Sequence, residues 1–168
     1  LKRDDGEVVY LHFLYNDNSK NIYQVANQIT TVGSRENRYD VTLLINGLPL
    51  IQIELKKPGV AISEAFNQVE RYRRDSYRGL FNFIQLFVIS NGVDTKYYAN
   101  SDYKIYPAFT FFWTDLNNNK YSELHDFAKQ FLSHKNITEV LTEYMILNSD
   151  KQLMVMRPYQ IYAVKAIM

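Results

Sequence analysis

The stretch RYDVTLLINGLPLIQIELKKPG, residues 38–59, decides the fold. Two runs rich in aliphatic and β-branched residues, 40–45 and 49–56, flank the dipeptide Asn46-Gly47. Asn-Gly between two such runs is a strong signal for a tight β-hairpin, because both residues tolerate positive φ angles. The stretch therefore predicts two antiparallel strands joined by a short turn.

The second strand of this hairpin alternates between apolar and polar residues, as a strand does when its two faces meet different surroundings. One face carries Ile51, Ile53 and Leu55, and the other carries Gln52, Glu54 and Lys56. Pro58-Gly59 ends the strand.

Further elements are expected on both sides of the hairpin. The expected strands are 8–15, 23–30, 83–90, 94–99 and 107–113. The expected helices are 63–77 with Ser63 as N-cap, 121–133, 136–146 and one that begins near Arg157-Pro158. This order predicts a mixed central β-sheet flanked by helices, an α/β or α+β fold.

Composition limits the class of protein. The chain has 168 residues, 46% of them hydrophobic, which suffices for one domain with a core. No apolar run approaches the ~18 residues of a transmembrane helix, and the first residues do not form a secretory signal. Zero cysteines exclude disulfides and cysteine zinc sites, which fits a reducing cytoplasm.

Charge is balanced, with 19 basic and 18 acidic residues, so any contact with DNA has to use a local patch. Residues 56–78 contain six basic residues against three acidic ones. A solvent-exposed helix face is the competing interpretation of this patch.

Two acids can meet across the hairpin. If its loop has three residues, 46–48, Asp40 falls opposite Glu54, with Cβ atoms ~5 Å apart. If the loop has two residues, Asp40 faces Ile53 instead, although a β-bulge could restore the pairing.

Paired carboxylates repel each other unless a cation lies between them, and a hard divalent ion prefers such oxygen ligands. Lys56 lies two residues beyond Glu54 on the same face, where its ammonium can stabilise negative charge. These groups suffice for metal-dependent hydrolysis of a phosphodiester. Taken alone, however, Glu-x-Lys in an alternating strand usually marks an exposed face.

Gln68 and Tyr72 lie four residues apart and therefore share one face of the expected helix. A short loop joins that helix to the end of the strand at Lys56, so the pair can reach the acidic face. The alternative is a half-buried Tyr72 and a surface Gln68.

The pattern Asp40-x13-Glu54-x-Lys56 followed by Gln68-x3-Tyr72 resembles the PD-(D/E)xK nuclease superfamily, in its Gln-x-x-x-Tyr (RecB-like) branch. The wider chain resembles the N-terminal part of the restriction subunit (HsdR) of type I restriction–modification enzymes. The resembling segments are 38–59, 65–73, 87–92 and RPYQIYAVKAI (157–167). The resemblance implies a restriction-endonuclease-like fold and a type I site-specific deoxyribonuclease.

The resemblance also implies roles for individual residues. Asp40, Glu54 and the Leu55 carbonyl are expected to hold Mg²⁺, and Lys56 is the expected catalytic lysine. Gln68 and Tyr72 are expected to support the site. Phosphate contacts are expected from Lys57, Arg71, Arg73 and Arg74, and an adenine contact from Gln160. Two departures are that Tyr39 stands where the family has Pro and that an upstream acidic residue is not identifiable.

The same resemblance implies a longer protein. We expect a truncated N-terminus, an endonuclease domain over 1–147 and the start of an ATP-driven helicase motor over 148–168. No G-x-x-x-x-G-K-[ST] motif is present, so ATP is expected to act only in the longer subunit. The expected partners are double-stranded DNA and the methyltransferase and specificity subunits, in the cytoplasm. Two alternatives remain: another nuclease of the superfamily, RecB-like or type III-like, and a catalytically silent DNA-holding module.

Overall fold

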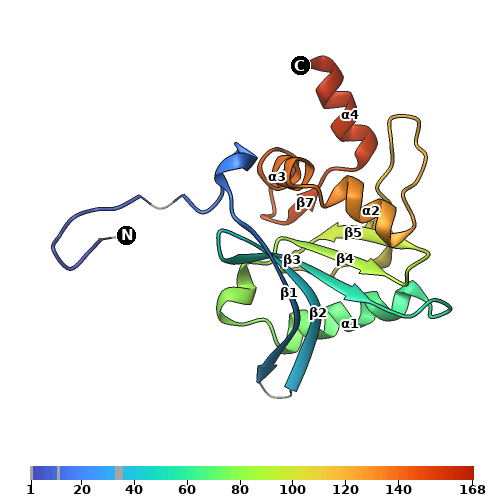
Figure 1. The fold of residues 1–168 in the computed structure, drawn as a ribbon, viewed down its shortest axis with the longest axis horizontal. Coiled ribbons are helices and arrows are strands. Elements are labelled where there is room, and N and C mark those ends of the chain that lie inside the picture. The colour runs from blue at the N-terminus through green and yellow to red at the C-terminus, as the bar shows by residue number, and fades with distance from the viewer. Residues whose placement is uncertain (1, 11, 33–35) are drawn as a thin grey trace.

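A five-stranded mixed sheet organises the protein, of which the computed structural model describes residues 2–10, 12–32 and 36–168 (Figure 1). The strands are β1 (Tyr23–Val32), β2 (Glu36–Ile45), β3 (Leu48–Leu55), β4 (Leu86–Ser90) and β5 (Thr95–Ala99), in that spatial order. Within the described strands of this sheet, β3 and β4 pair in parallel and the other three neighbouring pairs are antiparallel. A parallel pair needs a crossover, and α1 (Ile62–Asp75) supplies it. The expected mixed sheet with flanking helices is confirmed.

The helices cover both faces of the sheet. α1 packs on one face, and α2 (Leu124–Phe131) and α3 (His134–Glu143) lie on the other (Figure 1). The interior strand β4 contributes side chains to both hydrophobic cores. Leu86 and Val88 pack on the α2–α3 side, and Phe87 and Ile89 pack on the α1 side. All five residues of β4 are buried, as its continuous apolar sequence predicts.

The hairpin turn between β2 and β3 has two residues, so of the two loops considered the three-residue loop 46–48 is wrong and the two-residue loop with a β-bulge is present. Asn46 and Gly47 have φ angles of 53° and 80°, which a tight turn between twisted strands requires. The register then shifts: Leu44 pairs with Pro49, but Leu43 pairs with Ile51. Leu50 is therefore the extra residue of a β-bulge, next to a proline that has no N–H to give to the ladder.

Three local expectations are wrong. Among 8–10 and 12–15 the chain forms only one isolated bridge, Lys2–Val8, and it extends away from the body as an arm (Figure 1). Residues 107–113 contain a 3₁₀ turn, Pro107–Phe109, and a single bridge to β5. Ser63 lies inside α1, whose N-cap is Ala61.

The C-terminal segment packs on the α2–α3 side of the sheet. A small two-stranded sheet, β6 (Met145–Leu147) and β7 (Leu153–Val155), precedes α4 (Pro158–Ile167). Val155 and Ile161 belong to the same hydrophobic core as β3 and β4. No helix in the described part of the chain is long and apolar enough to cross a membrane.

Candidate active site

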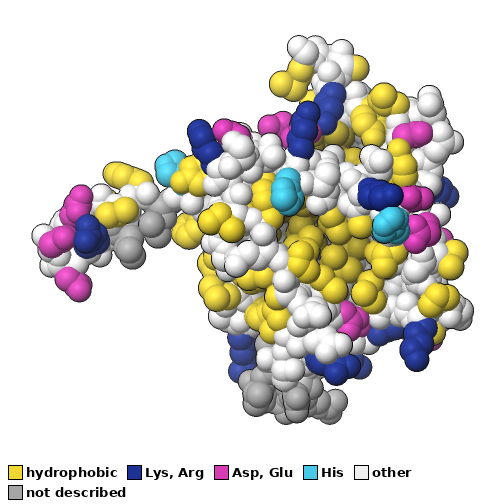
Figure 2. Space-filling view, in the orientation of Figure 1, with side chains coloured by type: hydrophobic (Ala, Val, Ile, Leu, Met, Phe, Trp, Pro, Cys, Tyr) yellow, Lys and Arg dark blue, Asp and Glu magenta, His cyan; other side chains and the backbone are white. Residues whose placement is uncertain are grey.

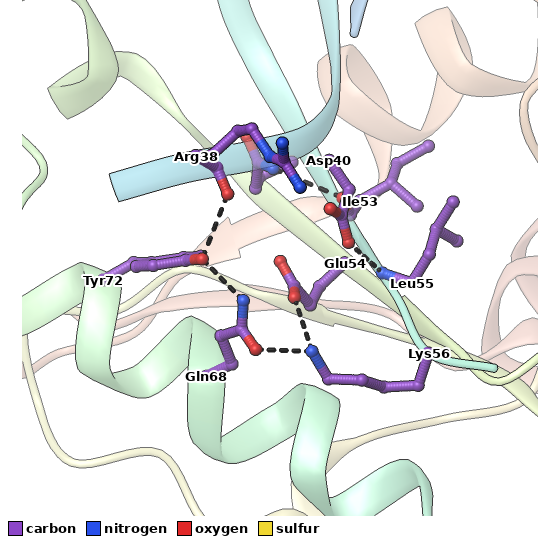
Figure 3. A network of polar contacts seen from close by, with 9 residues as sticks. Arg38, Asp40, Ile53, Glu54, Leu55, Lys56, Gln68 and Tyr72 are labelled. Atoms are coloured by element: carbon purple, nitrogen blue, oxygen red, sulfur yellow. Dashed lines mark hydrogen bonds and ion pairs between the residues drawn. The ribbon is translucent and has the colours of Figure 1, made fainter. Parts of the chain in front are cut away.

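The bulge brings Asp40 of β2 across from Glu54 of β3. Val41 pairs with Ile53, and the next step along this register sets Asp40 opposite Glu54. The Asp40 carboxylate bends toward the end of β3, where its Oδ2 accepts a 2.8 Å hydrogen bond from the Leu55 amide (Figure 3). Both acids therefore lie near the C-terminal end of the interior strand β3, on the face of the sheet that α1 covers.

Glu54 is a fully buried acid, with a side chain 0% exposed to solvent. Burial raises its pKa from 4.5 to about 7, because a low-dielectric surrounding disfavours the charged carboxylate. The hydrogen bond from Lys56 opposes this increase, and the charge of Asp40 adds to it. The electrostatic effect of Asp40 on Glu54 is what two neighbouring carboxylates are expected to show.

Lys56 begins a chain of polar contacts that crosses from β3 to α1 and back to β2 (Figure 3). Its Nζ donates to Glu54 Oε1 at 2.9 Å and to Gln68 Oε1. Gln68 Nε2 donates to the Tyr72 hydroxyl at 2.5 Å, and that hydroxyl donates to the Arg38 carbonyl at 3.1 Å. The structure thus brings together all five residues of the sequence pattern.

The donor set fits a hard divalent cation. Glu54 Oε2 is buried and has no hydrogen-bond partner among the described residues. A buried carboxylate oxygen without a partner is costly, and an ion with oxygen ligands would relieve that cost. The Asp40 carboxylate is adjacent, and the ammonium of Lys56 occupies the other oxygen of Glu54.

Four basic residues were expected to contact phosphates, and they fall into two groups. Lys57 and Arg71 line a groove of about 590 Å³ that Lys56 and Gln68 also line, whereas Asp40 and Glu54 do not line it. Arg73 and Arg74 instead line a separate groove on another side of α1.

Gln160 lies far from the acidic pair in sequence and serves as a helix cap. Its Oε1 accepts a 2.9 Å hydrogen bond from the Arg157 amide at the start of α4. It also lines a third pocket, of about 470 Å³, with Arg157 and Tyr159. The guanidinium of Arg157 lies 4.6 Å from the centre of the Phe111 ring.

A second group of metal-type side chains lies at the start of α2, and the sequence patterns did not point to it. Ligand atoms of Glu123, His125 and Asp126 lie within 4.8 Å of one another, and all three residues are exposed. Glu123 is the N-cap of α2, and its Oε2 accepts from the Asp126 amide at 3.2 Å. Helix capping accounts for this group, and the spacing Glu-x-His-Asp is its only sequence signal.

These features define a restriction-endonuclease-like α/β domain: a mixed sheet, helices on both of its faces and an acidic pair near the C-terminal end of β3. The chain belongs to the family described as "Type I restriction enzyme R protein N terminus (HSDR_N)", whose family model matches residues 2–104.

Curated relatives agree with this family. The chain is 52% identical to the "Type I restriction enzyme SsaAORF53P endonuclease subunit" of Staphylococcus saprophyticus, over 99% of this chain and 18% of that protein. It is 49% identical to the SauMSSORF170P endonuclease subunit of Staphylococcus aureus, again over 18% of the relative. It is 45% identical to the EcoprrI endonuclease subunit of Escherichia coli, over 98% of this chain and 55% of the relative. The chain therefore spans less than a fifth of the staphylococcal subunits it matches.

Proposed function

We propose that this domain hydrolyses phosphodiester bonds of double-stranded DNA with Mg²⁺, as the cleavage module of a type I restriction enzyme. The observation that carries the proposal is the pairing of Asp40 and Glu54 beside Lys56, with one buried oxygen of Glu54 left without a partner. The relatives' printed names, each an endonuclease subunit of a type I restriction enzyme, support the same activity.

In this proposal Asp40, Glu54 and the Leu55 carbonyl hold the ion. An Mg²⁺ ion bound there would polarise the scissile phosphate and lower the pKa of an attacking water. Lys56 releases Glu54 Oε1 and turns its ammonium toward the phosphate, where it stabilises the developing negative charge. Gln68 continues to accept a hydrogen bond from Lys56 during this change. Tyr72 accepts from Gln68 and donates to the backbone of β2, which holds Gln68 in position.

Contacts to the DNA backbone come from the basic residues near the acidic pair. Lys57 and Arg71 line the same groove as Lys56 and Gln68, so they are the first candidates for sequence-independent phosphate contacts. Arg74 lines the separate groove on another side of α1, so any phosphate contact that it makes lies there. Arg73 is the weakest candidate, because its guanidinium is already bound to groups of the protein.

The remaining proposals concern the longer subunit. We propose that residues 148–168 begin a helicase motor in which Gln160 contacts the adenine of ATP, while residues 1–147 form the endonuclease domain. The partners are then methyltransferase and specificity subunits, and the enzyme works in the cytoplasm, where its DNA is. The third pocket, which Gln160 lines, is compatible with this role.

Metal binding tests the cleavage centre directly. Isothermal titration with Mn²⁺ should show one saturable site in the wild-type chain, and Asp40→Ala should remove it. The matched control is Asp94→Ala, on the loop before β5 and outside the acidic pair. Absence of binding in the wild type at millimolar Mn²⁺ would favour the silent DNA-holding module.

Cutting is tested in the assembled enzyme. Lys56→Ala should lower the rate of cleavage by ~10²-fold or more, the loss typical of removing one group that stabilises transition-state charge. The same variant should retain ATP hydrolysis and DNA translocation, since Lys56 lies in the cleavage centre. Joint loss of cutting and ATP hydrolysis would argue against a separate nuclease centre.

A further inference from the structure

A second groove, of about 1210 Å³, lies between α1, the 3₁₀ turn Gly79–Phe83 and residues 100–107. Asn67 on α1 lines both this groove and the groove of Lys56 and Gln68, so the two grooves adjoin at α1. We propose that this second groove holds a single strand of DNA next to the cleavage centre, an inference that rests on the proposed nuclease function. One acidic pair hydrolyses one strand at a time, and a groove that holds one strand beside it selects the strand to be cut.

Aromatic rings on the groove wall supply the first argument. Tyr103 is 50% exposed and Tyr106 is 51% exposed, although rings of this size gain most from burial. Tyr77 and Phe81 line the groove further in. Exposed rings in a groove are platforms on which unpaired bases stack, whereas the bases of a duplex already stack on one another.

Charge in the groove suits a nucleic-acid backbone but is small in total. Lys104 lies 5.1 Å from the centre of the Tyr106 ring, so a cation and a stacking surface adjoin. Arg74 and Lys104 form no salt bridge with any described residue. Of the two acids that line the groove, Glu70 is paired with Arg73 at 2.6 Å, which leaves Asp102. Stacking therefore has to provide most of the affinity, and salt should weaken it only modestly.

Arg73 makes the groove rigid. Its Nε donates to Asn100 Oδ1 at 3.0 Å, and its terminal nitrogens donate to the carbonyls of Ser101 and Tyr103. These contacts fasten the far wall of the groove to α1. A groove that is already formed loses little conformational entropy when a strand enters it.

Binding of a fluorescent oligonucleotide of about 12 nucleotides tests the proposal, followed by anisotropy in EDTA so that no metal takes part. The wild-type chain should bind the single strand at least about fivefold more tightly than a duplex of equal length. Tyr106→Ala should weaken single-strand binding by about 5–100-fold, the range measured for loss of one stacking ring, and Tyr106→Phe should restore it. Arg74→Ala should weaken binding and lower the salt slope by about 0.7. Tyr10→Ala and Lys135→Ala, which change exposed residues away from the groove, should have no effect.

Equal affinity for single strand and duplex, or an unchanged affinity of Tyr106→Ala, would overturn the proposal. The proposed cleavage centre is tested separately, because Asp40→Ala should lose Mn²⁺ and keep the single strand. A wild-type chain that binds Mn²⁺ but no single strand refutes the groove alone. A chain that binds the strand through Tyr106 but binds no Mn²⁺ supports the groove and refutes the cleavage centre.

Discussion

Replacing Glu54 by Gln should stabilise the metal-free protein at alkaline pH. Burial of the carboxyl raises the pKa of Glu54 from 4.5 to about 7. One pKa unit corresponds to ~1.36 kcal/mol, so ionising Glu54 costs the folded state about 3 kcal/mol relative to the unfolded chain. Because the side chain is 0% exposed, solvent screening does not reduce this cost. A neutral glutamine of the same shape removes it.

The sign of the pH dependence follows from the direction of the shift. Since the folded-state pKa of Glu54 is raised, its contribution to stability is complete below pH 4.5 and is lost as the pH rises through about 7. Glutamine has no such proton. The Glu54→Gln variant should exceed the wild type by roughly 1 kcal/mol at about pH 5 and by about 3 kcal/mol at about pH 8.

Urea unfolding in EDTA at both pH values measures this difference directly. The difference of about 3 kcal/mol at about pH 8 corresponds to roughly 6–12 °C in Tm. Glu64→Gln is the control, because that glutamate is exposed on α1 and should change stability by less than ~0.5 kcal/mol. An excess of Mg²⁺ should stabilise the wild type and not the variant, by mass action on the folded state. A variant no more stable than the wild type at about pH 8, or a difference that does not grow with pH, would refute the reasoning.

Three other substitutions test the scaffold by urea unfolding. Arg73→Ala should lower the free energy of unfolding by about 2–4 kcal/mol, because it leaves the largely buried carboxylate of Glu70 unpaired. Arg71→Ala should lower it by less than ~0.5 kcal/mol. Equal losses would count against the structural role of Arg73. Gly47→Ala should cost about 1 kcal/mol, since φ is 80° there; a neutral result would mean a different turn. Thr42→Val should cost about 1–3 kcal/mol, because its hydroxyl donates to buried Gln52 Oε1 at 2.9 Å; a stable variant would show that water replaces the bond.

Local pattern was sufficient for the centre of the fold. The alternation over 49–56 and the Asn46-Gly47 turn are set by neighbouring residues, so β2, β3 and their face assignment could be predicted. The continuous apolar run that became β4 was equally clear. Both faces of that strand are buried, and its sequence leaves no polar face to expose.

Elements that depend on distant partners were the ones predicted wrongly. Residues 8–15 have the composition of a strand, but composition does not supply a neighbouring strand with free backbone groups. Residues 107–113 likewise are aromatic-rich, yet among the described residues they form a single backbone bridge to β5, at Phe111. The role of Arg73 was also out of reach, because the carbonyls it binds come from a loop about 30 residues away in sequence.

In the register that pairs Asp40 with Glu54, Leu50 stands outside the β2–β3 ladder. The turn Asn46-Gly47, followed by an unbroken ladder, pairs Ile45 with Leu48 and would set Asp40 against Ile53. Leu50, extra in the ladder and buried beside Ile51, moves the register by one residue and turns Asp40 to Glu54. Deletion of Leu50 should place the Leu43–Ile51 pair directly after the Leu44–Pro49 pair, so it should remove the bulge and keep Asp40 opposite Glu54. A folded deletion variant should therefore retain Mn²⁺ binding, as should Leu50→Ala. Loss of Mn²⁺ binding by the deletion variant would show that strand register alone does not pair the two acids.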